Sequence, residues 1–397
     1  MANERLVASQ RERVSAHAER ARAALLASAA GSSLDPISRR LRGARLPLPG
    51  SERWKYTPVN RVYERILTTL EAPAESAADD EAPPWVLSGA ARARPADAQT
   101  LVRSAQQIDS QRHPIADAVA IAVSTSHGDK GSGCWTIEVD GDAQLVLDAA
   151  TATTSWLQVV LAPGAHLTID ERQSPGALGV LRCELAAGAR ITHSRHASQD
   201  RFCWQLLDVE LADDASYALH HLSFGSELRR QENHFRLLGH RSSVEIDGAL
   251  LCGNNHRNDV QTIVEHKGRN SRSRQRYHGI AAGSGKVTVG GRIHIHTGAA
   301  GADAQLSNPN LALNEQTEIN TKPELEIYEE DVSCSHGATI GKLDEDALFY
   351  MRSRGIPEAA AREALLLAFV REGISGPAAE RGAAIASAEL KQWLAST

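Results

Sequence analysis

The chain has 397 residues, of which 42% are hydrophobic and 23% are charged, and its formal net charge is -6. This length exceeds that of one ordinary compact domain, and the hydrophobic content excludes a disordered chain. A pI near 6.2 argues against a general nucleic-acid binder. Aromatic residues make up only 4% of the chain, which favours a core of thin layers built from small side chains.

The cysteines point to a reducing compartment. There are five of them, and none forms a Cys-x-x-Cys pair: Cys134, Cys183, Cys203, Cys252 and Cys334. The N-terminal segment lacks the basic, apolar and small-residue order of a signal peptide, and no run approaches the roughly 18 apolar residues of a membrane helix. We therefore expect a cytoplasmic protein that does not enter a membrane.

The N-terminal part of the chain reads as helical. Residues 1–30 are rich in Ala, Arg and Glu and are followed by Gly31, which predicts a surface helix. A second helical pattern runs from Val59 to Leu70. The sequence EAPAESAADDEAPP, residues 71–84, is acidic and rich in Ala and Pro, as linkers are. These patterns predict a helical region over residues 1–70 and a linker after it.

Beyond the linker, apolar residues alternate as in strands, and the strands repeat. Similar segments align without gaps and start 22, 24 and 26 residues apart, at Val139, Leu161, Leu185 and Leu211. A degenerate copy begins at Leu237, and IAAGSGKVTV from Ile280 looks like a later copy. Repeats of this length with Gly or Asp turns predict a β-helix, in which each coil buries its apolar face on its neighbours. We expect this core to span residues 85–343.

The C-terminal region, residues 344–397, again reads as helical. Asp344 is a predicted N-cap, and Gly355 ends the first helix. Pro357 opens a second helix, and residues 377–394 could form a third. The second helix carries an apolar stripe at helical spacing: Leu365, Leu366, Phe369 and Val370.

Three other patterns have plain structural explanations. The Gly-rich segment GIAAGSGKV does not fit a phosphate-binding loop, because Val287 follows Lys286 where Ser or Thr is required. The basic segment 267–276, KGRNSRSRQR, is interpreted as a strand face that is solvated or paired with acids of a neighbouring coil. The strand histidines His294 and His296 could chelate a metal, but a solvated or stacked pair is favoured.

Most of the chemistry lies between Asn308 and Ile356. Cys334 and His336 are two residues apart, so they lie on one side of an extended segment and could bind iron or zinc. Two ligands are too few for a closed site. Spacing alone favours a buried cysteine beside a structural histidine. Five carboxylates precede this pair in the sequence: Glu324, Glu326, Glu329, Glu330 and Asp331.

This segment resembles the C-terminal signature of the SufB/SufD family of iron–sulfur cluster assembly scaffolds. The order Cys334-Ser335-His336-Gly337 is similar to the SufD branch of that family, and RWKYTPV at residues 53–59 is similar to its N-terminal motif. The resemblance implies a right-handed parallel β-helix flanked by helical regions. It also implies a non-catalytic scaffold subunit that pairs with a SufB-like subunit and docks on a SufC-like ATPase.

The family pattern also suggests roles for particular residues. It points to His336, with Cys334 second, as the candidate cluster-assembly site at the SufB interface, where the partner supplies the missing ligands. The stripe on the second C-terminal helix is a candidate either for packing within the chain or for docking on SufC. We expect no tightly bound cofactor in the isolated chain, and iron or an iron–sulfur cluster only transiently in the complex. A role in iron acquisition and homodimerisation of the isolated chain stay open.

Two readings from other classes compete with the scaffold. One is a β-helix enzyme acting on a carbohydrate, which would use carboxylates from successive coils. The repeats show no ladder of Asp at equivalent positions, which argues against it. The other is a stand-alone metal-binding protein that uses four residues: His294, His296, Cys334 and His336.

Overall fold

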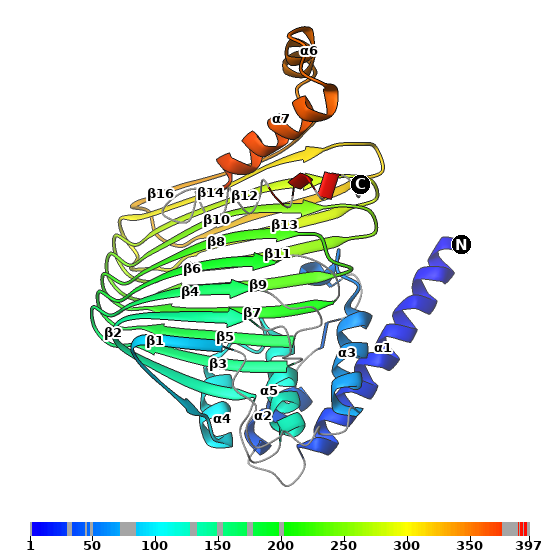
Figure 1. Ribbon diagram of the computed structural model, residues 1–397. Helices are drawn as coiled ribbons and strands as arrows, with labels where there is room; N and C mark the ends of the chain where they lie inside the picture. Colours follow the sequence, from blue (N-terminus) through cyan, green and yellow to red (C-terminus); the bar gives the residue numbers. More distant parts are fainter. Residues whose placement is uncertain are drawn as a thin grey trace.

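The computed structural model describes residues 2–29, 34–43, 46–47, 51–71, 85–127, 133–148, 154–172, 178–197, 202–374, 388, 390–391 and 393–394. Strands make up 48% of the chain and form a parallel β-solenoid of about seven turns with helices near both ends (Figure 1). This confirms the predicted β-helix with helical flanks. Except for Glu71, the predicted linker lies outside the described residues.

Two sheets face each other across the solenoid. Even-numbered strands after β2 form one sheet, odd-numbered strands the other, and β2 contributes to both, while β1 pairs antiparallel with β2. The strands are β1 Trp85–Pro95, β2 Cys134–Asp148, β3 Thr154–Leu161, β4 His166–Arg172, β5 Leu178–Leu185, β6 Arg190–Ala197, β7 Cys203–Leu211, β8 Ser216–Phe224, β9 Arg229–Leu237, β10 Ser243–Cys252, β11 Arg257–His266, β12 Arg272–Ala281, β13 Lys286–Ile295, β14 Ala302–Ala312, β15 Glu318–Ile327 and β16 Val332–Gly341.

The sequence repeats stack in register. The first residue of each predicted repeat pairs directly with the first residue of the next repeat, on the neighbouring strand. The order is Val139, Leu161, Leu185, Leu211 and Leu237. From Leu161 onward, each start ends an odd-numbered strand and precedes a tight turn to the even-numbered sheet. Gly164, Gly188 and Asp214 have positive φ angles in these turns, which explains the Gly or Asp at this place in each copy.

The copy proposed at Ile280 was wrong. Ile280 lies in β12, whose turn leads from the even-numbered sheet to the odd-numbered one, at the opposite edge of the solenoid. The residues that continue the register from Leu237 are His266, Ile295 and then Ile327. Both edges need tight turns with Gly or Asn, so local turn sequence alone does not distinguish them.

The core between the sheets is built from small and branched side chains, as the scarcity of aromatic residues predicts. Ala165, Ala189 and Ala215 follow the stacked turns and are buried. Among the described residues, the fully enclosed rings of this core are Tyr217, Phe235 and Tyr277. Each coil therefore adds one thin layer of apolar side chains, and each layer depends on its neighbours for burial.

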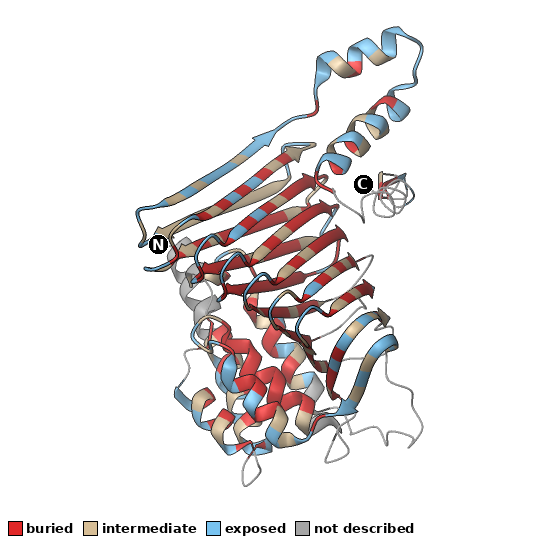
Figure 2. Ribbon diagram, turned by 90° about the vertical axis from the view of Figure 1, so that its left-hand side faces the viewer, coloured by how far each residue is buried: buried red, intermediate tan, exposed pale blue. Residues whose placement is uncertain are grey.

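The N-terminal helices cover the outer face of the odd-numbered sheet near the start of the solenoid. They are α1 Ala2–Ser28, α2 Asp35–Gly43, η1 Glu52–Trp54, α3 Val59–Glu71, α4 Ala98–Gln107 and α5 Pro114–His127. The predictions for α1 and α3 are confirmed, whereas α4 and α5 fall inside the range expected for the β-helix. The helices share one apolar cluster with Trp156, Val180 and Trp204 of the sheet (Figure 2).

After the last coil, α6 projects beyond the solenoid, whereas α7 lies beside the even-numbered sheet (Figure 1). These C-terminal helices are α6 Glu345–Ser353 and α7 Glu358–Glu372, with Asp344 capping α6 and Pro357 preceding α7 as predicted. Only five residues of the predicted third helix are described, and these are helical: Ala388, Leu390, Lys391, Trp393 and Leu394. None of the described helices has the length and apolar character that crossing a membrane requires.

Candidate functional site

The strand that carries Cys334 and His336 is β16, the last strand of the solenoid. β16 pairs with β14 from Val332 to Gly341 and ends the strand order of the sheet. Among the described residues, no strand pairs with its other edge. Figure 2 shows β16 as mostly exposed, in contrast to the buried strands in the middle of the solenoid, such as β9 and β10. An edge of this kind presents backbone N–H and C=O groups that another strand can pair with.

Cys334 and His336 lie on the core side of β16. Cys334 pairs with Ala304 and His336 with Leu306, and both β14 residues are buried in the core of the last coils. Paired residues of neighbouring strands point to the same face of a sheet. Cys334 is half-buried and His336 is exposed. The two side chains therefore stand at the open end of the core, where a further coil would otherwise cover them.

The chain leaves the solenoid directly after this strand. β16 ends at Gly341, and the carboxylate of Asp344 then accepts hydrogen bonds from the backbone N–H groups of Asp346 and Ala347, both 3.0 Å long. Such a cap starts α6 and turns the chain away from the coil path. Local sequence thus ends the solenoid at the point where Cys334 and His336 become accessible.

The pair has too few ligands for a complete metal site. Burial, and to a smaller extent the Asp303 carboxylate, raises the pKa of the Cys334 thiol, so the thiol is protonated at neutral pH and must lose its proton to bind a metal. Within the described part of the chain, no group of three His, Cys, Asp or Glu residues could hold a metal ion. A complete metal site would need further donors beside these two.

The other predicted metal-ligating residues lie elsewhere. His294 is on the outer face of β13 and His296 directly follows that strand, with their ring centroids 3.9 Å apart in a stacked arrangement, as the structural reading predicts. Glu326 lies across from His294 on β15, 3.7 Å away. The structure therefore does not bring the four residues of the stand-alone metal-binding hypothesis together, because one pair faces outward from the odd-numbered sheet and the other faces the core side of the even-numbered sheet.

The carboxylates before the Cys–His pair mostly have other partners. Glu324 accepts from Arg292 at 2.8 Å and pairs with Lys322 at 2.6 Å, on the outer face of β15. Glu329 accepts from the N–H of Gly298 at 2.9 Å in a neighbouring turn. These contacts neutralise Glu324 and hold the turn between β15 and β16 in place.

The basic segment also pairs as expected. Arg274 contacts Glu245 and Arg276 contacts Asp247, both on the neighbouring strand β10. These ion pairs follow the register of β10 and β12. They leave the segment as an ordinary paired strand face rather than a free positive stripe.

The apolar stripe of α7 packs within the chain. Leu366 and Val370 are buried, and Leu365 and Phe369 are half-buried, against the outer face of the even-numbered sheet. The Phe369 carbonyl is 2.8 Å from Nδ1 of His278, which lies on β12. This face of α7 is already covered, so it serves the packing role that the sequence analysis set beside docking.

The structure exposes a different apolar surface, on α6. Phe349 is 71% exposed and Tyr350 is 59% exposed, and the nearby Ile340 and Ile356 are exposed as well. Sequence reasoning missed this surface. The signal was the run of apolar residues from Leu348 to Met351, because a helix that contacts the body on one side cannot bury four consecutive side chains.

The RWKYT motif has a structural role that the sequence did not reveal. The guanidinium carbon of Arg230 lies 3.8 Å from the ring centroid of Trp54, and its Nη1 donates to the Thr57 hydroxyl at 3.0 Å. The same Thr57 hydroxyl donates to Asp259. Arg230 and Asp259 belong to β9 and β11. The motif thus locks the N-terminal region onto the outer face of the odd-numbered sheet.

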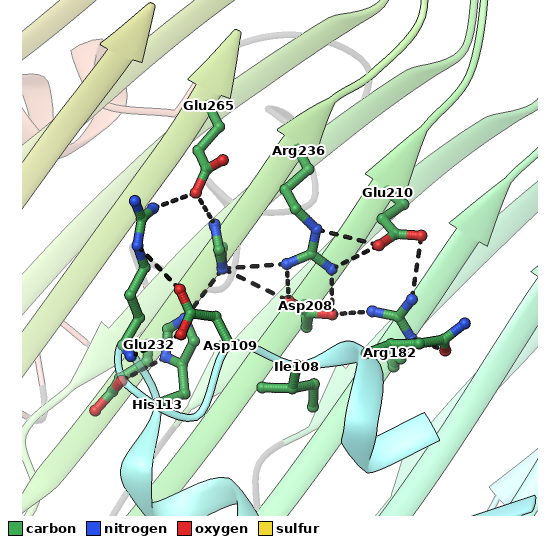
Figure 3. Close-up of polar contacts among 12 residues, drawn as sticks. Ile108, Asp109, His113, Arg182, Asp208, Glu210, Glu232, Arg236 and Glu265 are labelled. Carbon is green, nitrogen blue, oxygen red and sulfur yellow. Dashed lines mark hydrogen bonds and ion pairs between the residues drawn. The ribbon is translucent and has the colours of Figure 1, made fainter. Parts of the chain in front are cut away.

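A buried polar network beside this motif was also missed. It joins the segment before α5 to β5, β7, β9 and β11 on the outer face of the odd-numbered sheet (Figure 3). Arg182 and Arg236 both pair with Asp208, and His113 contacts His234. These residues are separated by up to 123 positions in the chain, so no local pattern indicates that they meet.

Comparison with known proteins agrees with this architecture. Residues 145–369 match the profile of a family described as "SUF system FeS cluster assembly, SufBD core domain". The chain is 33% identical over 222 residues to the iron-sulfur cluster assembly protein SufD of Escherichia coli, covering 53% of this chain and 52% of that protein.

Two further relatives come from photosynthetic organisms. The chain is 33% identical over 202 residues to the chloroplastic protein ABCI7 of Arabidopsis thaliana, covering 49% of this chain and 42% of that protein. It is 29% identical over 190 residues to an iron-sulfur cluster assembly SufBD family protein of Synechocystis, covering 47% and 42%. The chain spans about half the length of the curated relatives it matches. Because the family profile covers more than half of its residues, from the first full coils to α7, the chain belongs to the SufBD core family of the SUF system and is similar to SufD.

Proposed function

We propose that the chain is a non-catalytic scaffold subunit for iron–sulfur cluster assembly that works as part of a complex. Family membership supports the role, and the unfinished Cys334–His336 pair at the open end of the solenoid is the observation that carries it. A pair of donors that one chain leaves incomplete is useful where a second chain completes the site. Iron or an iron–sulfur cluster is the cargo of this site rather than a resident cofactor.

The partner at the open end is a SufB-like subunit in this proposal. Two observations support pairing there: no strand in the described part of the chain pairs with the outer edge of β16, and the end of the core exposes apolar side chains, including those of Ile327 and Ile340. A strand added to β16 would satisfy its backbone groups, as in other cases of strand addition. It would also place donors of the partner beside Cys334 and His336.

A SufC-like ATPase is the second partner, and α6 presents the docking surface. The α7 stripe is covered by the solenoid, whereas Phe349 and Tyr350 of α6 are exposed at the projecting end of the molecule. Large exposed apolar side chains that lie together are typical of protein interfaces. Because α7 packs on β8, β10 and β12, a movement of the docked ATPase would be transmitted directly to the even-numbered sheet that ends in β16.

The chemistry at the open end depends on the charge states of the two side chains. A neutral imidazole at His336 can ligate iron or help to deliver it, whereas an imidazolium cannot. The Cys334 thiol has a raised pKa in the free chain, and binding of a metal cation would favour its thiolate. Cluster assembly should therefore weaken at acidic pH, and pairing with the partner would complete the site.

The test is co-expression of the chain with its SufB-like and SufC-like partners, followed by purification of the complex and measurement of its iron and sulfide content. His336→Ala should abolish cluster assembly and leave the three-subunit complex intact, because the side chain is exposed. The matched control is His240→Ala, an exposed histidine in a turn between β9 and β10. Normal assembly by His336→Ala would refute the assigned role, and failure to recover any complex would refute the partners.

A further inference from the structure

Two buried histidines contact each other between the N-terminal region and the solenoid. His113 precedes α5 and His234 lies in β9, and both side chains are almost fully buried. Nε2 of His113 is 3.1 Å from Nδ1 of His234, a hydrogen-bond distance (Figure 3). One of these two nitrogens must therefore carry a proton.

Each outer end of the pair faces a carboxylate. Nδ1 of His113 is 2.8 Å from Glu232, and Nε2 of His234 is 3.0 Å from Glu265. Burial opposes the ionisation of both carboxyl groups, but their arginine, lysine and histidine neighbours outweigh it and hold each pKa well below its usual range. Ionised carboxylates only accept hydrogen bonds, so both outer nitrogens must donate.

The count of protons follows from these three contacts. Together they require three N–H groups on the two rings, whereas two neutral imidazoles carry only two. The pair therefore holds one additional proton. Arg236 places the charge, since its Nη1 can only donate and lies 3.2 Å from Nδ1 of His234, which must then be the acceptor and shares its one lone pair between Arg236 and Nε2 of His113. His113 is left with both of its nitrogens protonated. Burial also lowers the pKa of His234 to about 4, in agreement with a neutral ring there.

Charged groups from every neighbouring element face the pair or its two carboxylates. Arg230 and Trp204 donate to Glu232 at 2.9 and 3.3 Å, and Arg53 lies 3.5 Å from it. Around Glu265 and His234 the other groups are Arg112, Lys267, His296, Asp208 and, through its pair with Arg112, Asp109.

We propose that His113 and His234 form a singly protonated pair that acts as a pH-sensitive latch, fastening the segment before α5 to β9 and β11 of the solenoid. Arg112 of the same segment contacts Glu265, and its carbonyl accepts from Arg53 of the RWKYT motif. The latch therefore also supports the motif that locks the N-terminal region onto the sheet. Loss of the shared proton would leave one of the three contacts without a hydrogen.

The sign of the pH effect follows from proton linkage. Free imidazoles in the unfolded chain titrate near pH ~6.5, so above that pH the unfolded chain releases the proton that the folded pair retains. Stability from the latch is therefore lost as pH rises above this value and continues to fall until the folded pair itself releases its proton. In this pH range the folded chain binds one proton more than the unfolded chain. The unfolding constant therefore rises about tenfold for each pH unit.

The variant Glu232→Gln isolates this proton. Its carbonyl can replace the oxygen that accepts from Arg230 and Trp204, while its NH₂ replaces the oxygen that faces His113 and donates to Nδ1, with loss of the 3.5 Å contact from Arg53 to that oxygen. A neutral pair then satisfies all three contacts with His234 unchanged. The matched control is Glu210→Gln, which alters the same network through Arg182 and Arg236 but does not touch the pair.

The measurement is urea unfolding of the full chain at several pH values between 7.5 and 9. We expect the unfolding constant of the wild type and of Glu210→Gln to rise with pH about tenfold per unit more steeply than that of Glu232→Gln. Equal slopes for all three proteins would overturn the proposal. If Glu232→Gln does not fold, ¹⁵N NMR of histidine-labelled wild type decides. One imidazole protonated on both nitrogens at pH 8, and absent from His113→Asn, supports the proposal; only singly protonated rings refute it.

Discussion

The apolar surface of α6 gives the sharpest prediction about partners. Phe349 and Tyr350 are 71% and 59% exposed in the chain. An aromatic side chain buries about 150–250 Å², so the two rings together offer roughly 260 Å² to a partner. At about 25 cal/mol per Å², their complete burial contributes at most about 6.5 kcal/mol. Alanine retains part of that contact and binding orders the rings, so we expect a loss of about 3 kcal/mol for the double substitution to alanine.

The assay is titration calorimetry of the chain with the proposed partner, a SufC-like ATPase. A loss of about 3 kcal/mol corresponds to a rise in Kd of roughly 150-fold. The free energy of unfolding should hardly change, because both side chains are exposed and alanine favours a helix. Leu366→Ala is the contrasting variant, since it removes a buried contact of α7 and should lower stability by about 2–5 kcal/mol. Unchanged affinity in a folded Phe349→Ala/Tyr350→Ala protein would show that the ATPase docks elsewhere.

Three further predictions test the fold and its thiols. Leu211→Ala should lower the free energy of unfolding by about 2–5 kcal/mol, since Leu211 is stacked and buried between two neighbouring coils, whereas the exposed Leu238→Ala should change it by less than about 0.5 kcal/mol in the same denaturation assay. Thr57→Val should cost about 1–3 kcal/mol, because buried Asp259 loses a donor, with the exposed Thr68→Val as its control; equal effects of the two would contradict the motif's locking role. A thiol reagent at pH 8 should label one cysteine in the folded chain, Cys334, and none in Cys334→Ser. The other four are buried, and burial raises the pKa of Cys203 to about 11 and those of Cys134 and Cys252 to about 12; fast labelling of more than one thiol would contradict their burial.

Much of the fold could be predicted because each coil of a solenoid repeats the same pattern of strands and tight turns. The starts at Leu161, Leu185 and Leu211 carry the same turn chemistry, and the structure pairs them in one register. The same locality explains the error at Ile280, because turns at both edges of the solenoid use the same residue types. Helices α4 and α5 were missed because they lie between two strands of the solenoid, where the repeat pattern gives no signal.

The residues of the candidate site could be predicted from sequence, but their surroundings could not. Its residues, Cys334 and His336, were identified from sequence, because a signature segment is contiguous in the chain. Their position at the open end of the core depends on which strand ends the sheet, and this follows only from the stacking of all the coils. The choice between packing and docking for the α7 stripe could not be made from sequence for a similar reason, since the exposure of the stripe depends on the outer face of a distant sheet.

The sequence by itself determined the stacked-coil architecture, the helical ends, the scarcity of rings and the segment that carries the Cys–His pair. Each of these depends on neighbours along the chain or on a repeat of fixed length. Only the tertiary structure decided which edge strand is free, which helical face is covered, and that His113 meets His234 between two carboxylates. The two histidines are 121 positions apart in the chain, and the charge of such a pair depends on partners that no local pattern specifies.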